Sequence, residues 1–289
     1  MFSTILVPID GSEYSARILW QIKRLAMHEA TSVELFTAVV PILESWRERQ
    51  EDRQDRSERH PTLRLQDAQR NLDKLVEGLT KEGIKASARV ERGHAADLIL
   101  RRAEETGAQL VAVATHGRSG PGLWLRGSVT QRLLQHCPVP VLCLNPHAEE
   151  QEIQGVLFKH ILVPLDGSSR SAQVLPLAQE FAKIHESELV LHAVGATPPD
   201  NPVNDGMVDY LERLQQKLEE AGCKARVRVD FGAPAKEILE AVDSEKIDLV
   251  VIGTHGQSGL EKWVMGSVTE KILRRCPTPL LVKRTAQLT

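Results

Sequence analysis

The chain contains two copies of one sequence unit, and this repeat constrains the fold more than any other feature. The segment 5–12, Ile-Leu-Val-Pro-Ile-Asp-Gly-Ser, reappears at 161–168 as Ile-Leu-Val-Pro-Leu-Asp-Gly-Ser, an offset of 156 residues. Later matches, from Gly83 with Gly222 to Pro140 with Pro279, keep an offset of 139. The first copy therefore carries about 17 extra residues between its second strand and second helix. Copies that are related over nearly their whole length indicate a duplicated domain rather than a solenoid of short repeats.

The length of 289 residues suits two domains, each large enough to bury its own core. We predict a first domain at 1–145, a linker at 146–157 and a second domain at 158–289. The extra segment of the first copy, at about 44–60, mixes acidic and basic residues densely and includes Trp46. Two interpretations are open: a regulatory or partner-binding flap, or a solvated extension stabilised by local ion pairs.

Within each copy, short apolar segments rich in β-branched residues alternate with segments of helical pattern. Almost wholly apolar strands are typical of a parallel sheet that is covered on both faces. The fold class is therefore α/β, with two tandem copies of an open five-stranded parallel sheet sandwiched by helices. We expect strands near 4–9, 33–39, 85–91, 109–115, 139–144, 160–165, 188–194, 224–230, 247–253 and 279–283, and in the first copy helices near 13–30, 62–81, 95–106 and 128–136.

Composition excludes several classes of function. The net charge of −3 is too small to indicate nucleic acid or an acidic membrane surface as a partner. There is no apolar run of about 18 residues, so we expect no membrane span. The N-terminus enters a strand directly, without the layout of a signal peptide, and the four cysteines form no CxxC pair. These features favour a reducing cytoplasm.

A loop punctuated by glycine follows the fourth strand of the second copy. It reads Gly253-Thr-His-Gly256, then nine residues, then Gly266-Ser267 at the start of a helical pattern. Glycine lets a backbone approach a guest closely, and the free N–H groups of a first helical turn bind anions. Ser267 has a second interpretation, as an ordinary N-cap. The loop recurs in the first copy with alanine in place of the first glycine, as Ala114-Thr-His-Gly117 through Gly127-Ser128.

Asp10 and Asp166 each follow the first strand of a copy, where open α/β sheets bind their ligands. A carboxylate there could accept hydrogen bonds from a ligand. Asp-Gly-Ser is also strong turn chemistry by itself, so an Asx-turn or a partial helix cap is the alternative. The recurrence of the aspartate beside a glycine loop favours a binding role.

Taken together, these two motifs resemble those of the universal stress protein family in its tandem two-domain form. The resemblance covers residues 1–285, and the glycine motif is similar to that of the ATP-binding branch. It implies a strand order of 3-2-1-4-5, with the ligand crevice between strands one and four. It also implies ATP, ADP or AMP as the ligand, with Mg²⁺ as an optional companion of the phosphates. No metal ligands are assigned.

The resemblance also implies roles for individual residues. In the second copy the nucleoside and phosphates would be held by Pro164, Asp166, Ala193, Ile252, Gly253, His255, Gly256, Gly266, Ser267, Val268 and Thr269. Less firmly supported counterparts in the first copy are Pro8, Asp10, Val113, Ala114, His116, Gly117, Gly127, Ser128, Val129 and Thr130. Ala114 matters only if its position needs positive φ or touches the ligand, so binding by the first copy is left open.

The most direct function is an adenine-nucleotide-binding stress-response regulator with slow or no hydrolysis. The chain lacks the P-loop and its phosphate-binding lysine, which favours binding over turnover. His116 and His255 have no nucleophile or carboxylate at suggestive spacing, so no catalytic residue is assigned. A slow ATP hydrolase, and an interaction module with one or both pockets vestigial, are the alternatives. The apolar last strands, 139–144 and 278–282, would be sheet edges that invite pairing. The resemblance implies that the two halves pair through these strands as a pseudo-dimer, and intact chains could pair again.

Overall fold

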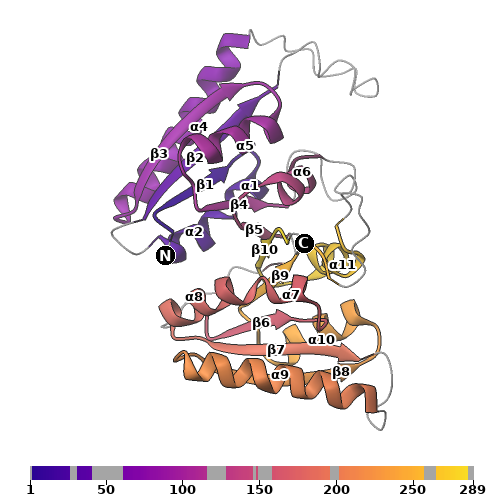
Figure 1. Ribbon diagram of the computed structural model, residues 1–289. Coiled ribbons are helices and arrows are strands. Elements are labelled where there is room, and N and C mark those ends of the chain that lie inside the picture. Colours follow the sequence, from indigo (N-terminus) through magenta and orange to yellow (C-terminus); the bar gives the residue numbers. More distant parts are fainter. Residues whose placement is uncertain are drawn as a thin grey trace. The chain divides into compact units, whose positions relative to one another are not determined.

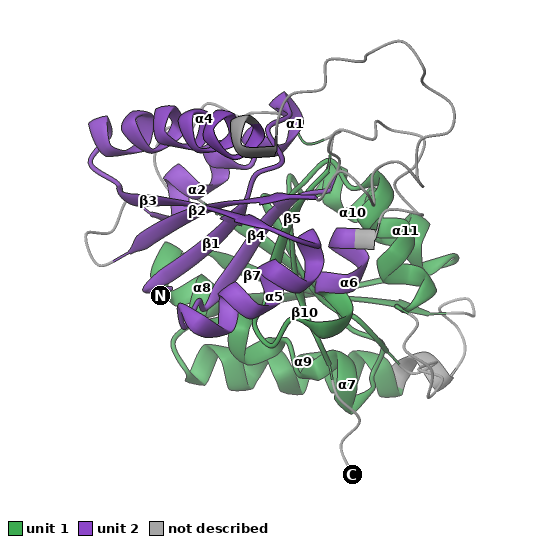
Figure 2. Cartoon of the chain, turned by 90° about the horizontal axis from the view of Figure 1, so that it is seen from above, with its two compact units in different colours: residues 1, 134–289 green, residues 2–133 purple. Residues whose placement is uncertain are grey.

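The computed structural model describes residues 2–26, 31–40, 61–115, 128–145, 148, 158–195, 202–256 and 265–285. These form two compact units, residues 2–133 and residues 134–289 with residue 1 (Figure 2). The expected insertion at 44–60 lies outside the described residues, as do His116, Gly117 and Gly127. The division of the chain at 145 and 158 stays a prediction.

The unit of residues 2–133 holds a parallel sheet in the order β3-β2-β1-β4 (Figure 1). All four strands belong to the first repeat. The elements of this repeat are β1 (Thr4–Pro8), α1 (Glu13–Ala16), α2 (Leu19–Leu25), β2 (Ser32–Val39), α4 (Pro61–Lys81), β3 (Lys85–Arg92), α5 (Ala95–Glu105), β4 (Leu110–Ala114) and α6 (Ser128–His136), whose last residues belong to the other unit.

The unit of residues 134–289 holds the second repeat together with β5 (Val141–Leu144), the last strand of the first. Its five own strands follow the order β8-β7-β6-β9-β10, all parallel, which confirms the expected 3-2-1-4-5 order. The elements are β6 (His160–Pro164), α7 (Ser169–Ala172), α8 (Leu175–His185), β7 (Glu188–Gly195), α9 (Pro202–Glu220), β8 (Lys224–Phe231), α10 (Pro234–Ser244), β9 (Leu249–Gly253), α11 (Ser267–Arg275) and β10 (Leu280–Lys283).

Strand β5 pairs with β10 in the antiparallel direction, with Cys143 opposite Leu280 and Val141 opposite Val282. The predicted pairing of the two last strands is therefore present inside this unit. Each of these four residues is at most 2% exposed. The apolar edge of β10 is thus covered by a strand that the sequence assigns to the other repeat.

The strands are buried because helices lie over them. Ile161, Leu162 and Val163 of β6 are fully buried, which accounts for the continuous apolar run in the sequence. Helix α8 packs on β6 and β7, α9 packs on β7 and β8, and α10 packs on β7, β8 and α11. A strand that is covered in this way is accessible to a ligand only at its ends.

The first helical segment of each repeat differs from its prediction. The expected helix at 13–30 is two helices, α1 and α2, and its counterpart is divided into α7 and α8. Pro176 lies in the first turn of α8, where its missing N–H costs no intrahelical hydrogen bond, so it suits the start of a new helix in the second repeat. The first repeat has no proline there, and nothing in the structure explains the same break.

Candidate functional site

The candidate site of the second repeat lies at the carboxyl ends of β6 and β9. These strands are parallel neighbours, with Ile161 opposite Leu249 and Leu162 opposite Val250. From β6 the chain continues outward through β7 and β8, and from β9 it continues on the other side to β10. This is the reversal of strand order at which open α/β sheets bind ligands.

The loop after β6 is a tight turn built around Asp166. Its Oδ1 accepts hydrogen bonds from the Ser168 amide at 3.0 Å and from the Ser168 hydroxyl at 2.6 Å. Gly167 takes a φ of 80°, which favours glycine, and Ser168 caps α7 by accepting from the Ser171 amide at 3.1 Å. The Asx-turn interpretation therefore holds for one carboxylate oxygen.

The first repeat builds the same turn. Asp10 Oδ1 accepts from the Ser12 amide at 2.9 Å and from the Ser12 hydroxyl at 2.6 Å. Gly11 has a φ of 83°. Because both copies agree in these contacts, the turn is a property of the Asp-Gly-Ser sequence itself.

The second oxygen of Asp166 faces the loop after β9. A Cβ built on Gly256 would fall inside the contact distance of Asp166 Oδ2 and would meet the carboxyl carbon at 3.0 Å. Gly256 does not have a positive φ. Glycine is therefore required by a close approach, which brings the motif after strand one against the motif after strand four.

The position of Gly253, the last residue of β9, also has no room for a side chain. Its φ is not positive, but an added Cβ would lie 2.8 Å from the Thr285 methyl carbon. In the first repeat the corresponding positions carry Ala114 and Pro146. The first repeat therefore has alanine in place of Gly253, and it also lacks the threonine whose methyl group leaves no room for a side chain there.

Thr254 and Thr285 fix the loop that carries His255. The Thr254 amide donates to the Lys283 carbonyl at 3.0 Å, and the Thr285 amide donates to the Thr254 hydroxyl at 3.2 Å. The His255 amide donates to the Thr285 hydroxyl at 3.2 Å, and His255 Nδ1 lies 3.0 Å from the Thr254 hydroxyl. Through these contacts His255 helps to hold the loop in place.

Helix α11 begins at the same place, with Gly266 as its N-cap and no side-chain cap. Ser267 is the first helical residue, so the interpretation of Ser267 as an N-cap is wrong. The Gly266 amide donates to the Thr254 carbonyl at 2.9 Å, and the Thr269 hydroxyl donates to the Gly253 carbonyl at 2.9 Å. Helical geometry leaves the first N–H groups without an intrahelical acceptor, so the uncapped start of α11 suits an anion.

The structure places the remaining predicted residues of the second repeat nearby. Pro164 ends β6, Ile252 is the penultimate residue of β9, and Val268 lies in the first turn of α11. Ala193 is 1% exposed in β7, one position beyond His192, whose carbonyl accepts from the Leu165 amide at 2.8 Å. Ala193 therefore lies at the strand end beside β6.

The structure describes only part of the set of ligand-binding residues that was predicted for the first repeat. Pro8 ends β1, Val113 and Ala114 end β4, and Val129 and Thr130 lie in the first turn of α6, which begins at Ser128. The connecting loop is not among the described residues, so the geometry of its glycines stays a prediction.

Three residues of the site were not expected from the sequence: Thr254, Thr285 and Tyr210. No pattern marks the threonines, because their role arises from a loop and a strand end that are 31 residues apart. Tyr210, in α9, lies near enough to Asp166 that, after burial, the charge of the carboxylate also raises the pKa of the phenol. Its counterpart in the first repeat is Asn71.

The four cysteines are buried free thiols. Burial raises the pKa of Cys276 to about 12, so this side chain is a protonated thiol at neutral pH. Among the described residues, no group of three or more His, Cys, Asp or Glu side chains could hold a metal ion. In that part of the chain, no helix combines the length and apolarity that crossing a membrane requires.

An α/β unit with a parallel sheet and an Asp-Gly-Ser turn after its first strand, present twice in one chain, defines a class of tandem α/β proteins. The model of the universal stress protein family matches residues 1–145 and again 157–284. The chain therefore belongs to the universal stress protein family.

Individual relatives agree with this assignment. A universal stress protein of Mycolicibacterium smegmatis is 27% identical over 298 residues, which cover 97% of this chain and 96% of that protein. A universal stress protein of Methanocaldococcus jannaschii is 31% identical over 139 residues, which cover 44% of this chain and 82% of that protein. The crystal structure of a universal stress protein from Archaeoglobus fulgidus superposes with a TM-score of 0.72 and 20% identity, over 98% of this chain and 97% of that one. At this identity the last comparison supports the fold alone.

Proposed function

We propose that the second repeat binds an adenine nucleotide at the carboxyl ends of β6 and β9. The observation that carries the proposal is the close approach of Gly256 to Asp166 beside the uncapped start of α11. The carboxylate would accept hydrogen bonds from the ribose or base, and the first N–H groups of α11 would hold the phosphates. Because the described residues offer no cluster of metal ligands, Mg²⁺ would enter bound to the phosphates.

The proposed activity is regulation by binding, with slow or no hydrolysis. The sequence has no P-loop lysine to stabilise charge on the β- and γ-phosphates. A nucleotide in this position would contact the loops after β6 and β9 and the start of α11, and so would stabilise their joint arrangement. The buried free cysteines suit a reducing compartment, and we place this function in the cytoplasm.

For the first repeat we propose weaker binding or a non-catalytic interaction role. Ala114 and Pro146 replace Gly253 and Thr285, and proline has no N–H to repeat the bond that Thr285 donates to Thr254. The loop after β4 therefore cannot be fixed in the same way. A pairing of intact chains through their sheets remains part of the proposal.

The experiment is to denature the purified full-length protein in acid and to identify the released nucleotide by mass spectrometry. We expect close to one ATP, ADP or AMP per chain, and titration calorimetry of the emptied protein with ATP, ADP, AMP and cAMP then ranks the ligands. Gly256→Glu is expected to abolish retention, because it places bulk and negative charge between Asp166 and the phosphates. Gly206→Ala is the matched control, because nothing lies within 4 Å of a Cβ at that position. Full nucleotide content in Gly256→Glu would place the site elsewhere.

Hydrolysis is measured separately. A time course with labelled ATP at saturating protein is expected to show less than one turnover in several minutes, with or without Mg²⁺. Rapid multiple turnover would replace the proposed regulator with an ATP hydrolase.

A further inference from the structure

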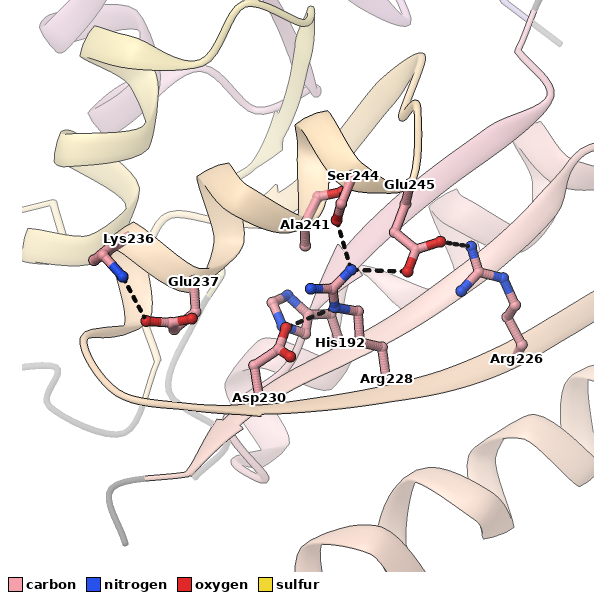
Figure 3. A network of polar contacts seen from close by, with 9 residues as sticks. All are labelled: His192, Arg226, Arg228, Asp230, Lys236, Glu237, Ala241, Ser244 and Glu245. Carbon is pink, nitrogen blue, oxygen red and sulfur yellow. Dashed lines mark hydrogen bonds and ion pairs between the residues drawn. The ribbon is translucent and has the colours of Figure 1, made fainter. Parts of the chain in front are cut away.

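A histidine lies in the core of the second repeat, one position before the predicted ligand residue Ala193. The His192 side chain is fully buried in β7, and its Nε2 lies 2.9 Å from Asp230 Oδ2 on β8 (Figure 3). A carboxylate can only accept a hydrogen bond, so Nε2 is the nitrogen that carries the proton. Nδ1 is buried and has no hydrogen-bond partner among the residues that the structure describes.

The charged groups around this imidazole form a continuous network. Asp230 Oδ2 also accepts from Arg228 Nε at 2.6 Å, so one oxygen serves both the imidazole and the guanidinium. Arg228 continues to the Glu245 carboxylate at 2.7 Å and to the Ser244 hydroxyl at 2.8 Å, at the end of α10 (Figure 3). The Arg228 guanidinium therefore partly neutralises the negative charge of Asp230, which weakens the attraction of that carboxylate for a second proton on His192.

The network extends along β8 and α10. Glu245 binds Arg226 at 2.6 Å, and Arg226 binds Glu188 of β7 at 3.0 Å. At the start of α10, Lys236 and Glu237 pair with each other at 3.4 Å. On the β6 side, the residue in register with His192 is Pro164, which carries no charge.

These surroundings disfavour a second proton on the imidazole. A proton would add an N–H at Nδ1, which is buried with no acceptor, and would bury a positive charge near Arg228. Burial is the main cause of the lowered pKa of His192; Arg228 lowers it further, while Asp230 and Glu245 oppose the shift. Burial alone would raise the pKa of Asp230, yet the bonds from Arg228 and His192 bring it below its usual value, so this partner is ionised in mild acid.

The first repeat shows that the fold does not require an imidazole here. The residue at the matching position of β2 is Phe36, which is 1% exposed. Arg89 and Glu91 repeat the pair of Arg228 and Asp230, with Arg89 Nε 3.2 Å from Glu91 Oε1, but Ser87 and Thr106 occupy the places of Arg226 and Glu245, so only part of the network is repeated. An aromatic ring fills this space in both repeats, and only the second repeat has one that can take up a proton.

We propose that His192 is an acid sensor, such that protonation at Nδ1 loosens the carboxyl ends of β7 and β8 in the second repeat. The His192 carbonyl accepts from the Leu165 amide at 2.8 Å, directly before Asp166. Movement of this strand end therefore reaches the turn after β6. The inference concerns the protein without ligand and does not depend on nucleotide binding.

The direction of the effect follows from linkage. The folded chain holds this imidazole neutral, whereas the unfolded chain takes up a proton near pH ~6.5. Its contribution to stability is therefore complete above that pH and is lost as the pH falls from there toward the lower folded pKa.

The test is hydrogen–deuterium exchange of the full chain, emptied of ligand, at pH 7.5 and pH 5.5, corrected for intrinsic exchange rates. In the wild type, peptides from β7 and β8 are expected to exchange roughly threefold faster or more at the lower pH. His192→Phe, which introduces the residue of the first repeat, is expected to remove this difference. The control is His160→Gln, whose side chain is 37% exposed on β6 and which is expected to behave as the wild type. An equal acid effect in His192→Phe would overturn the proposal.

A second measurement follows the imidazole in the wild-type chain itself. The imidazole signals of His192 are identified by their loss in His192→Phe and are followed by NMR from pH 8 to 4.5. The proposal expects the Nε2-protonated neutral form at pH 7.5 and a midpoint below the ordinary imidazole value of about 6.5. A midpoint at or above that ordinary value would exclude the acid sensor.

Discussion

At the residue scale, the site is defined by where side chains are excluded. Gly253, Gly256 and Gly266 have no positive φ, so conformational freedom does not explain them. Each is instead crowded: by the Thr285 methyl group, by the Asp166 carboxylate and, for a Cβ on Gly266, by the Thr254 carbonyl at 3.2 Å. The glycine motif thus allows three chain segments to meet at one point.

Gly256→Ala tests this crowding without adding charge. The new methyl group would displace the Asp166 carboxylate from Ser168, and we expect a loss of roughly 1–3 kcal/mol in the stability of the second repeat. The loss is measured by denaturant unfolding, which is monitored through hydrogen exchange in peptides of that repeat. Gly206→Ala serves as the neutral control. Unchanged stability would show that Asp166 moves aside freely.

Gly253→Ala tests the contact with Thr285. A methyl group 2.8 Å from the Thr285 methyl carbon is expected to cost about 1–3 kcal/mol. Thr285→Ser removes the clashing carbon and keeps the hydroxyl that bonds His255, so the double variant should recover most of the loss. A double-mutant cycle gives the coupling energy, and a value near zero would contradict the explanation offered for Ala114.

At the element scale, the parallel sheet follows from features that the sequence displays, whereas its strand order was implied by the resemblance to the universal stress protein family. Apolar strands at fixed spacing and an internal repeat determine a parallel sheet, and the strand ends place Asp166 beside the glycine loop. The start of α11 at Ser267 agrees with the expected helical pattern, but of the two interpretations of Ser267 the N-cap is wrong, because Gly266 takes that position. Thr254 and Thr285 could not be found in advance, since their bonds join a loop to the end of β10 across 31 residues. The charged network of His192 depends likewise on strand register, which pairs His192 with Arg228.

One hydrogen bond ties α11 to β9 and so fixes the direction of its first amides. Thr269→Val removes the bond from the Thr269 hydroxyl to the Gly253 carbonyl and keeps the side-chain shape. Because the hydroxyl is buried, we expect a loss of about 1–3 kcal/mol and faster amide exchange in α11. Thr269→Ser, which retains the hydroxyl, is expected to lose less. Equal exchange in both variants would mean that packing alone holds the helix.

At the scale of the whole molecule, the duplication has produced two repeats with different chemistry. The second repeat has Asp166 against Gly256, threonines that fix the loop, and a buried imidazole. The first keeps the Asp10 turn but has Ala114, Pro146 and Phe36 at the corresponding positions. On the proposals above, the second repeat responds to ligand and acid, whereas the first binds more weakly or serves in interactions.

This asymmetry predicts a response to ligand that is confined to one repeat. A ligand that binds only the folded state stabilises it by about 2.7 kcal/mol when its concentration is 100 times Kd. With excess nucleotide we therefore expect hydrogen exchange to slow by roughly 100-fold in peptides of β6, β9 and α11, where exchange occurs by unfolding of the repeat. Peptides of β1 and β4 should be unchanged. Gly256→Glu, which has no working site in this scheme, should show no slowing anywhere. Equal protection of both repeats in the wild type would mean that Ala114 and Pro146 leave the first site intact, and the proposed division of roles would then be wrong.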